Sequence, residues 1–400
     1  MIGTKIKKNG EKIINKEIEN FDLEYVYIPV TSHQLKKGDN VSEGDIVGEN
    51  HNLNVYSSVS GTITDFSKKN TLYGEEEVVI IKTNNKTKKY NLKDLKIDKK
   101  QFINMLKENS IIGLGGAGFP TYKKYDVETI DTLIINAIEC EPYIMSDYII
   151  SIKYAKEIID TIYRIMEINN IRKSYIGLKK DNKKVIDALK KYIKDKKIEI
   201  KELPSLYPMG WERSLIKQIT NITYDKLPIE KNIVVNNIST IYAINEMFKG
   251  KPLYERVITI TGNVVENPKV LKVKNGTLVK DILKEVKIKD DYTIIAGGPM
   301  MGKEVTEDFV ITSNVNCILV MAKNKNKSIN CLRCGKCINA CPVKIDPVLI
   351  KDSVNNVEKL KKLDCLKCIE CGLCSYVCPS NIPVRDYVIE AKSKLRKEKK

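Results

Sequence analysis

Eight of the eleven cysteines lie in two closely spaced runs after residue 330 of the 400-residue chain. In each run, two residues separate the first three cysteines from one another, three residues precede the fourth, and a proline follows it. Thiolates bind zinc and iron strongly, so clustered cysteines at this spacing are candidate ligands of metal centres. The first run contains Cys331, Cys334, Cys337 and Cys341, and the second contains Cys368, Cys371, Cys374 and Cys378.

The doubled spacing resembles that of bacterial ferredoxins with two [4Fe-4S] clusters, in which the fourth cysteine of each run ligates the other cluster. The alternative is a pair of zinc knuckles, but zinc pairs usually lack the third cysteine at this position. Such clusters pass single electrons, so the pattern predicts electron transfer. The predicted ligand sets are Cys331, Cys334, Cys337 and Cys378 for one cluster, and Cys368, Cys371, Cys374 and Cys341 for the other.

Three cysteines, Cys140, Cys317 and Cys365, remain outside these sets. We interpret Cys140 as a buried structural thiol, and Cys365 as a spare, because the spacing from Cys368 onward is already complete. Free thiols and iron–sulfur clusters fit a reducing cytoplasm. No signal-peptide pattern and no run of about 18 apolar residues occurs, so we expect neither secretion nor a transmembrane segment.

The net charge is +17, with 68 Lys and Arg against 51 Asp and Glu. The lysines are spread along the whole chain, and no nucleic-acid-binding motif accompanies them, so we expect no nucleic-acid partner. A solvated lysine surface is the simpler interpretation, and docking to an acidic partner or an anionic membrane face is the sharper one. The densest basic block is residues 392–400.

The elements that must position these residues begin with a β-rich N-terminal region. Residues 1–20 are polar and are predicted to form a loose lead-in. Short alternating runs from residue 24 to 82, broken by turns at Gly38 and Gly44, predict strands. This region resembles the barrel-sandwich domains of lipoyl and biotinyl carriers, but no carrier-lysine motif is present, so we predict a structural module.

Helical and strand patterns then alternate from residue 98 to about residue 250, which predicts an α/β domain with a largely parallel sheet. The predicted strands are 132–137, 174–178, 198–202 and 233–236, and the predicted helices are 101–108, 147–168, 182–194, 212–219 and 239–248.

A glycine-rich loop, residues 113–121 (GLGGAGFPT), lies within this region. Four glycines in six residues let the backbone approach a ligand closely with its N–H groups pointing inward. The loop is neither a Walker A motif nor a GxGxxG fingerprint, and it predicts a phosphate cradle, with an ordinary tight turn as the alternative.

A second β-rich unit follows, with predicted strands at 257–260 and 270–272 and a helix at 278–286. It resembles a ubiquitin-like β-grasp. Its loop 297–302 (GGPMMG) is too apolar for a phosphate site and is treated as a turn. A Lys- and Asn-rich linker, residues 323–330, leads to the cysteines.

Several motifs together resemble one family, RnfC, a peripheral component of an ion-pumping ferredoxin:NAD oxidoreductase, and its relative, the NADH-binding flavoprotein of complex I. The motifs are the glycine loop, Asn136–Pro142 (NAIECEP), Tyr207–Glu212 (YPMGWE) and Asn236–Thr240 (NNIST). The resemblance implies a barrel-sandwich domain (1–90), an α/β FMN- and NADH-binding domain (96–250), a soluble-ligand-binding β-grasp (254–322) and a two-cluster ferredoxin domain (328–400).

The resemblance also implies which residues bind the cofactors. FMN would be held noncovalently, NADH would stack on it, and Gly118, Glu139 and Gly210 would belong to the same site. FMN would meet Gly113, Gly115, Gly116, Lys124, Asn136, Asn236 and Asn237. NADH would meet Phe119, Glu141 and Glu212. The residue types agree, since amides and a lysine suit phosphate, and carboxylates accept from hydroxyls or a carboxamide.

Two departures from the family pattern open alternatives. Trp211 replaces a small or acidic residue beside the flavin, and Ile138 stands where the complex I relatives carry an acid. The leading prediction is an NADH-oxidising flavo-iron–sulfur protein that is cytoplasmic or peripheral on the inner face of the membrane, with other members of its complex or a ferredoxin as partners. One alternative is the soluble relative PrdC, which passes electrons to proline reductase. Another is a flavin-free iron–sulfur relay, and a carrier or ligand-binding module is a third.

Overall fold

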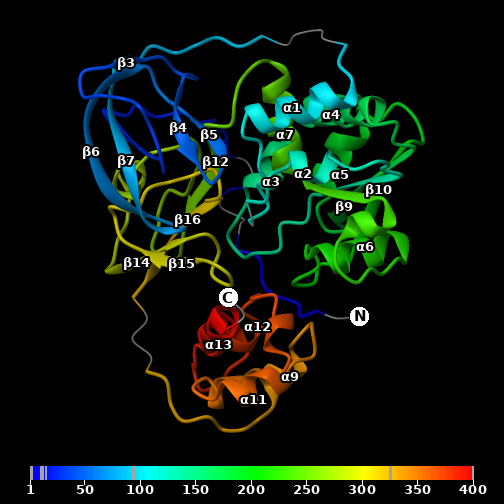
Figure 1. The fold of residues 1–400 in the computed structure, drawn as a ribbon. Helices are drawn as coiled ribbons and strands as arrows, with labels where there is room; N and C mark the ends of the chain where they lie inside the picture. The colour runs from blue at the N-terminus through cyan, green and yellow to red at the C-terminus, as the bar shows by residue number, and fades with distance from the viewer. Residues whose placement is uncertain are drawn as a thin grey trace.

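The structure is a computed structural model that describes residues 3–9, 13, 16–91, 96–116, 118–323 and 327–398 (Figure 1). In Figure 1 an N-terminal β unit lies at the left, an α/β unit at the right, and a second β unit below the first. A small helical unit that carries the cysteine runs lies at the bottom. Among the described residues, no helix is both long enough and apolar enough to span a bilayer.

The N-terminal β unit contains a four-stranded sheet in the order β2-β7-β6-β3 and a two-stranded sheet of β4 and β5. Alternate side chains such as Val26, Ile28, Val79 and Ile81 point inward and form its core, as the period of two predicts. The strands are β2 (Tyr25–Pro29), β3 (Asn40–Val41), β4 (Ile46–Asn50), β5 (Leu53–Tyr56), β6 (Gly61–Thr71) and β7 (Gly74–Thr83).

The prediction of a loose N-terminal lead-in is wrong for the described residues. Ile18–Glu19 forms strand β1, which pairs in parallel with β13 of the second β unit. Thr4 pairs with Tyr207 of the α/β unit, and Ile13 is fully buried in the main core. A two-residue edge strand leaves no alternating pattern in the sequence, because its surroundings are lysine and asparagine.

The α/β unit is built on a four-stranded parallel sheet in the order β10-β9-β8-β11. The chain moves outward from β8 to β9 and β10, and then returns to the other side of β8 to form β11. In open parallel sheets, ligands bind beyond the carboxyl ends of the strands where the order reverses, which here is between β8 and β11. The strands are β8 (Thr132–Asn136), β9 (Lys173–Lys179), β10 (Ile198–Leu203) and β11 (Ile233–Asn237).

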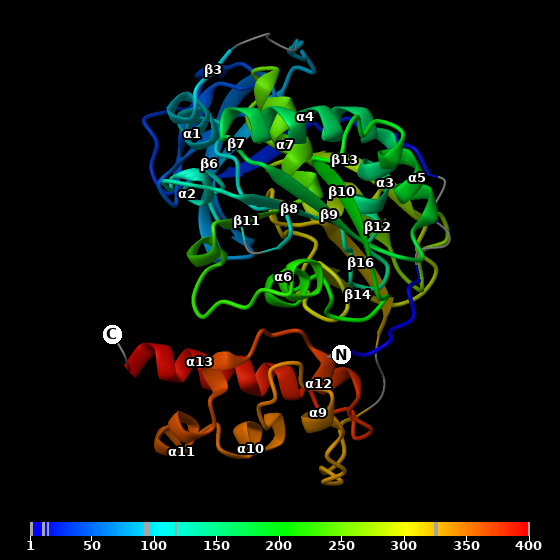
Figure 2. The same ribbon diagram turned by 90° about the vertical axis from the view of Figure 1, so that its right-hand side faces the viewer.

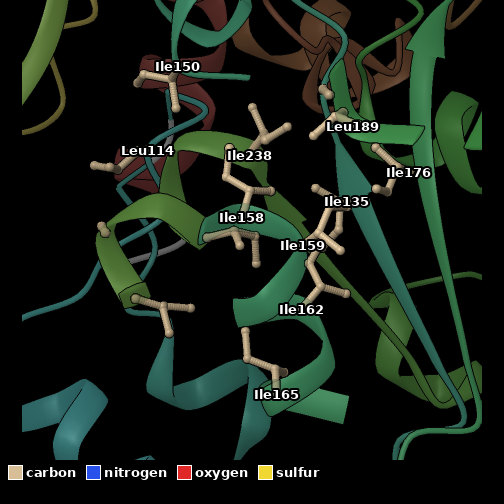
Figure 3. Packing of buried hydrophobic residues seen from close by; sticks show 14 of the residues in the cluster. Leu114, Ile135, Ile150, Ile158, Ile159, Ile162, Ile165, Ile176, Leu189 and Ile238 are labelled. Carbon is tan, nitrogen blue, oxygen red and sulfur yellow. The ribbon is translucent and has the colours of Figure 1, made fainter. Parts of the chain in front are cut away.

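Helices cover both faces of this sheet (Figure 2). One face packs against a large helical layer, in which Ile158, Ile159, Ile162 and Ile165 of α4 form the apolar stripe of an amphipathic helix (Figure 3). The other face packs against α6 (Glu212–Thr220), with a short 3-10 helix η1 (Pro228–Lys231) before β11. The helices of this unit besides α6 are α1 (Lys99–Glu108), α2 (Tyr122–Tyr125), α3 (Ser146–Lys153), α4 (Ala155–Ile168), α5 (Lys183–Lys190) and α7 (Ile238–Phe248).

The single helix predicted for residues 147–168 is instead two helices, because Tyr154 has φ −118° and ψ 31°. The two parts have different partners. In α3, Asp147 accepts a hydrogen bond of 2.7 Å from the Asn237 side chain at the end of β11. At the start of α4, the Tyr154 ring stacks on Tyr242 of α7, with centroids 4.3 Å apart. The break lets one segment reach the sheet edge while the other packs along α7.

The second β unit is a six-stranded mixed sheet in the order β1-β13-β12-β16-β14-β15, with the short helix α8 (Val279–Leu283) against it. This agrees with the predicted β-grasp, although the helix is shorter than expected. The loop 297–302 joins β14 to β15 and extends toward the cysteine unit. The strands added here are β12 (Glu255–Thr261), β13 (Lys269–Lys274), β14 (Tyr292–Ala296), β15 (Lys303–Val305) and β16 (Cys317–Ala322).

The cysteine unit contains short helices around a small core of Ile345, Ile350, Leu360, Val388 and Leu395. The described part of the basic block 392–400 is the end of its last helix. The helices are α9 (Lys336–Asn339), α10 (Pro347–Asp352), α11 (Val357–Lys362), η2 (Cys365–Lys367), α12 (Leu373–Tyr376) and α13 (Val384–Glu398).

Candidate functional site

The glycine loop follows α1 and closes on itself. The Gly113 N–H donates to the Phe119 carbonyl at 2.8 Å, and the Gly118 N–H donates to the Gly113 carbonyl at 3.2 Å. Gly118 has φ +62°, and a Cβ at this position would lie 2.8 Å from the Asn314 side chain. Only glycine fits there without strain. The closure leaves the Phe119 ring 46% exposed, so this ring is free to stack on a planar ligand.

The middle of the loop has the open backbone that a phosphate needs. Gly115 and Gly116 are exposed, and a Cβ on Gly116 would meet nothing within 4 Å. The neighbouring Leu114 is fixed, because its N–H donates to the Thr240 hydroxyl at 2.9 Å. Gly115 faces Asn237, whose Cβ would lie 3.3 Å from a Cβ at Gly115. Ala117, between the two pairs of glycines, lies outside the described residues.

Polar side chains stand at the carboxyl ends of β8 and β11, where the strand order reverses. The Asn136 amide donates to the Gly210 carbonyl at 2.9 Å, and its oxygen accepts from the Ile138 N–H at 3.1 Å. The Asn236 amide donates to the Tyr125 hydroxyl, while its own side-chain oxygen is buried without a partner. These contacts bring the glycine-loop helix α2, both strand ends and the 207–212 segment to one place.

Asn237 has a structural role in addition to its predicted contact with a cofactor. Its side-chain oxygen caps α7 by accepting from the Ser239 N–H at 2.8 Å. Its amide donates to Asp147, which also accepts from the Ser239 hydroxyl. The side chain is therefore held by α3 and α7, and the face of Asn237 toward Gly115 forms part of the site.

Lys124 lies in α2, directly after the glycine loop, and its Nζ donates to the Val235 carbonyl at 2.7 Å. Burial lowers the pKa of this ammonium below its usual range, and the nearby Glu212 carboxylate opposes that shift. A cation with so little water around it and only one carbonyl partner gains from a second anionic contact. A phosphate is a suitable partner for it.

The acidic loop after β8 contributes two buried carboxyls. Burial raises the pKa of Glu139 to about 7, although the ammonium of Lys8 opposes the shift. Burial also raises the pKa of Glu141 to about 7, and the Met300 N–H, which donates to Glu141 Oε2 at 2.9 Å, opposes the shift. Carboxyls with perturbed pKa values in one loop are typical of functional sites.

The 207–212 segment forms the remaining side. The Gly210 N–H donates to Cys140 Sγ at 3.0 Å, and a Cβ at Gly210 would lie 2.8 Å from the Ile138 carbonyl. Trp211 directly precedes α6 and is partly buried, and Glu212 begins that helix. The Glu212 carboxylate accepts from the Tyr224 hydroxyl at 3.2 Å.

Unpartnered buried atoms gather at this site and test whether it fits a polar cofactor. Four side-chain oxygens without a hydrogen-bond partner belong to Thr121, Glu139, Glu141 and Asn236. Buried polar groups are nearly always paired, so an unsatisfied cluster indicates a place where a ligand supplies hydrogen bonds. FMN, with its phosphate, ribityl hydroxyls and ring amide, offers both donors and acceptors, so the residues fit it.

The cavities beside the glycine loop reach it only at other residues. One cavity includes Leu114, and a larger one, between the two β units, includes Gly118 and Pro120. Neither is lined by Lys124, Asn136 or Glu212. The hydrogen bonds of Lys124 and Asn136 to main-chain carbonyls occupy that space, so FMN would take over these donors.

The eight cysteines of the two runs divide between two cavities of the cysteine unit. No group of three or more His, Cys, Asp or Glu side chains in the described part of the chain converges closely enough for a single metal ion. A four-iron cluster holds its thiolates farther apart than one ion does. The first cavity is lined by Cys331, Cys334, Cys337 and Cys378. The second cavity is lined by Cys341, Cys368, Cys371 and Cys374.

This grouping is the one that the ferredoxin rule predicts, with the fourth cysteine of each run crossing to the other set. Cys365 lines neither cavity and is fully buried in the small core. Cys140 and Cys317 lie in the α/β and second β units, and burial raises the pKa of both thiols, which favours structural, protonated side chains.

The second cavity adjoins the flavin side of the molecule. The Tyr207 hydroxyl donates to the Cys371 carbonyl at 2.6 Å. Met300, from the loop 297–302, packs with Tyr207, Cys371 and Leu373 in one buried cluster, while its N–H holds Glu141. A contact chain therefore runs from the acidic loop through Met300 to a cysteine of the second cavity.

Arg385 of α13 fixes this junction. Its Nη2 donates to the Met301 carbonyl at 2.8 Å, its Nη1 to the Gly302 carbonyl at 3.3 Å, and its Nε to the Glu370 carbonyl at 3.1 Å. Sequence reasoning missed Met300, Tyr207 and Arg385 in these roles. The apolar loop was interpreted as a turn, and the only signal that could have found it was its pair of methionines between glycines.

Comparison with known proteins agrees with this arrangement. The family model of the Nuo51 FMN-binding domain matches residues 106–246, and that of the 4Fe-4S dicluster domain matches residues 330–382. The NAD+-reducing [NiFe]-hydrogenase in its air-oxidized state contains a chain of similar fold, with a TM-score of 0.55 and 15% sequence identity. That match covers 74% of this chain and 63% of the hydrogenase chain.

Curated relatives match most of the chain, and each is the RnfC-type member of its complex. That of the proton-translocating ferredoxin:NAD(+) oxidoreductase complex of Clostridium ljungdahlii is 32% identical, over 84% of this chain and 80% of its own length. That of the Na(+)-translocating ferredoxin:NAD(+) oxidoreductase complex of Acetobacterium woodii is 31% identical, over 82% of this chain and 81% of its own. That of the ion-translocating oxidoreductase complex of Vibrio cholerae is 34% identical over 90% of this chain, which spans half of that relative's length.

The predicted cofactors are confirmed at the level of domains, because one domain is of the FMN-binding type and the other of the dicluster type. The residue-level assignments above stay predictions, as do the four domain limits. With relatives above 30% identity along most of its length, the chain belongs to the RnfC family of ion-translocating ferredoxin:NAD(+) oxidoreductase complexes.

Proposed function

We propose that this chain takes electrons from NADH at an FMN site and passes them through two [4Fe-4S] clusters. FMN accepts a hydride as an electron pair and can give up its electrons singly. The site lies at the carboxyl ends of β8 and β11, between the glycine loop and the 207–212 segment. The observation that carries the proposal is the hydrogen bond from Tyr207 to Cys371, which joins this site directly to a cysteine of the second cavity.

The residues divide the work of binding. The open amides of the glycine loop and the ammonium of Lys124 would hold the FMN phosphate. Asn136, Asn236 and Asn237 would hold the ribityl chain and ring by their amides. The exposed Phe119 ring would stack on a ring of the dinucleotide, and Glu141 and Glu212 would accept hydrogen bonds from its hydroxyls or carboxamide.

The position of the two cavities sets the order of electron transfer. The second cavity packs against Tyr207 and Met300, whereas the cysteine run of the first cavity lies on the side of its unit away from the flavin site (Figure 2). Electrons therefore enter at the cluster of Cys371 and leave from the cluster of Cys334.

The acceptor belongs to the proposal as well. The relatives described above are all named as parts of a complex, which supports other members of such a complex as the partners of this chain. We propose that the chain is peripheral to such a complex on the cytoplasmic side. A soluble reductase such as proline reductase, or a free ferredoxin, is the alternative acceptor, and co-purification of the chain with membranes or with soluble protein separates the two.

A flavin-free relay is the second candidate function, and one observation favours it. Trp211 lies partly buried beside Gly210, and the amides and ammonium predicted to meet FMN are paired with main-chain carbonyls. Because Trp211 is the only tryptophan of the chain, its fluorescence reports this site alone. Quenching by added FMN supports the flavin site, and an unchanged spectrum supports the relay.

The direct test is an anaerobic titration of the reconstituted protein with NADH. The proposal predicts one tightly bound FMN, eight iron atoms per chain, and bleaching of the cluster absorbance by NADH. Protein that holds eight irons but no FMN, and that dithionite but not NADH reduces, would select the relay.

A further inference from the structure

The two cysteine runs have the same local structure. Arg333 and Glu370 occupy equivalent positions with φ of 51° and 58°, and their N–H groups donate to Cys331 Sγ at 3.4 Å and Cys368 Sγ at 3.3 Å. Gly335 and Gly372 follow with φ of 72° and 78°, and each begins a one-turn helix, α9 or α12. What surrounds one run can therefore be compared position by position with what surrounds the other.

The face of the second run is covered by the rest of the chain. A Cβ on Gly372 would lie 2.3 Å from the Met300 carbonyl, and Cys371 and Leu373 are buried. Arg385 binds this face to the loop 297–302 through main-chain carbonyls. This is the surface through which, under the proposed function, electrons enter.

The equivalent face of the first run is uncovered. A Cβ on Gly335 would meet nothing within 4 Å, and Cys334 is exposed. The apolar side chains beside it, Leu332 and Ile338, are 63% and 37% exposed. In Figure 2 the segment that leads into α9 lies at the bottom, on the side of the cysteine unit away from the rest of the molecule.

The uncovered face is also charged differently. Arg333 stands where the second run has Glu370, and Lys336 stands where it has the buried Leu373. The Arg333 side chain is 80% exposed, and its nearest acid, Asp352, lies 3.9 Å away and is already bound by Lys351 at 2.6 Å. A positive rim therefore surrounds an apolar centre over an exposed cysteine.

We propose that this exit face, formed by Leu332, Arg333, Cys334, Lys336 and Ile338, docks an iron–sulfur protein with an acidic rim around its own cluster. An apolar centre with a charged rim is the usual anatomy of a specific interface, and small faces of this type suit transient electron-transfer contacts. Rim charges of one sign select a partner of the other and speed its association. The direction of electron flow through the face rests on the proposed function, whereas the docking does not.

The test uses the full, cluster-loaded chain and an acidic two-cluster ferredoxin of low isoelectric point as the probe. The double variant Arg333→Glu with Lys336→Glu is compared with Lys86→Glu with Lys89→Glu, which makes the same charge change at exposed lysines of the N-terminal β unit. Iron content and cluster absorbance confirm that each variant is loaded. Binding is followed by calorimetry at low and high salt.

The proposal predicts at least tenfold weaker binding of the probe for the exit-face variant and a shallower salt dependence, with the control within twofold of wild type. Leu332→Ser should weaken binding without changing the salt dependence, because it removes only apolar contact. Chains reduced with dithionite should also pass electrons to the probe more slowly in the exit-face variant. This readout needs neither NADH nor FMN, so it stands apart from failure of the proposed function. Equal binding by both charge variants, no binding by wild type, or self-association through this face would each overturn the proposal.

Discussion

The Tyr207 hydroxyl and the Cys371 carbonyl are joined by a buried hydrogen bond of 2.6 Å, which connects the 207–212 segment to the second cysteine run. Around it, Met300 contacts both the acidic loop and the second cavity. The junction depends on a few specific contacts, so single substitutions can test it.

Replacing Tyr207 by Phe removes this hydrogen bond and leaves the Cys371 carbonyl buried without that partner. The loss of a buried hydrogen bond costs about 1–2 kcal/mol, so we expect a looser junction and slower reduction of the clusters by NADH in stopped-flow measurements. Tyr376→Phe, at an exposed tyrosine of α12, is the matched control and should leave the rate unchanged. Equal rates for all three proteins would show that the contact does not lie on the electron path.

Replacing Lys124 by Ala removes the ammonium beside the glycine loop. The loss of a hydrogen bond from a charged group costs about 1.5–3 kcal/mol, so FMN should bind about ten- to hundredfold more weakly. The affinity can be measured from quenching of Trp211 fluorescence. Lys123→Ala, at the exposed neighbouring residue, should bind FMN as wild type does. If both variants bind FMN equally well, Lys124 does not hold the phosphate.

The pH dependence of stability tests the environment of Glu141. Its pKa is about 7 in the folded chain against an ordinary value of 4.5, so the folded state holds a proton that the unfolded state has lost. Stability must therefore fall as pH rises through this window, by about 1.4 kcal/mol between pH 6 and pH 8 for one such group.

Glu141→Gln stays neutral, so guanidinium unfolding of this variant should show a smaller fall over the same interval. Part of the fall should remain, because Glu139 also has a pKa of about 7. Glu304→Gln, at an exposed position of β15, serves as the control. A pH dependence identical in wild type and Glu141→Gln would mean that Glu141 is not held protonated.

Much of the site was visible in the sequence because its signals are local. Cysteine spacing predicted the two groups of four thiols, and the structure places Cys341 and Cys378 across from their own runs, as that spacing implied. The alternating pattern predicted the parallel sheet, whose strand ends bring Asn136 and Asn236 together. Glycine spacing likewise marked the loop that Gly118 allows to close.

What the sequence could not show depends on contacts between distant segments. The pairing of Ile18–Glu19 with β13, and the contact of Met300 with Cys371, leave no periodic pattern. The break at Tyr154 was missed because α3 and α4 share one apolar period, while their different partners appear only in three dimensions. Glu141 was expected to face a dinucleotide, and the structure shows that one of its oxygens also holds the loop 297–302.

The order of the clusters is the central claim, and ligand substitution in each cavity tests it most directly. Cys334→Ser should damage the first cluster, and NADH should still reduce the cluster of the second cavity, as seen by electron paramagnetic resonance. Cys371→Ser should damage the second cluster, and NADH should then fail to reduce the remaining cluster, although dithionite reduces it. Normal NADH reduction of the first cluster in Cys371→Ser, with its loss in the second cluster of Cys334→Ser, would contradict the account.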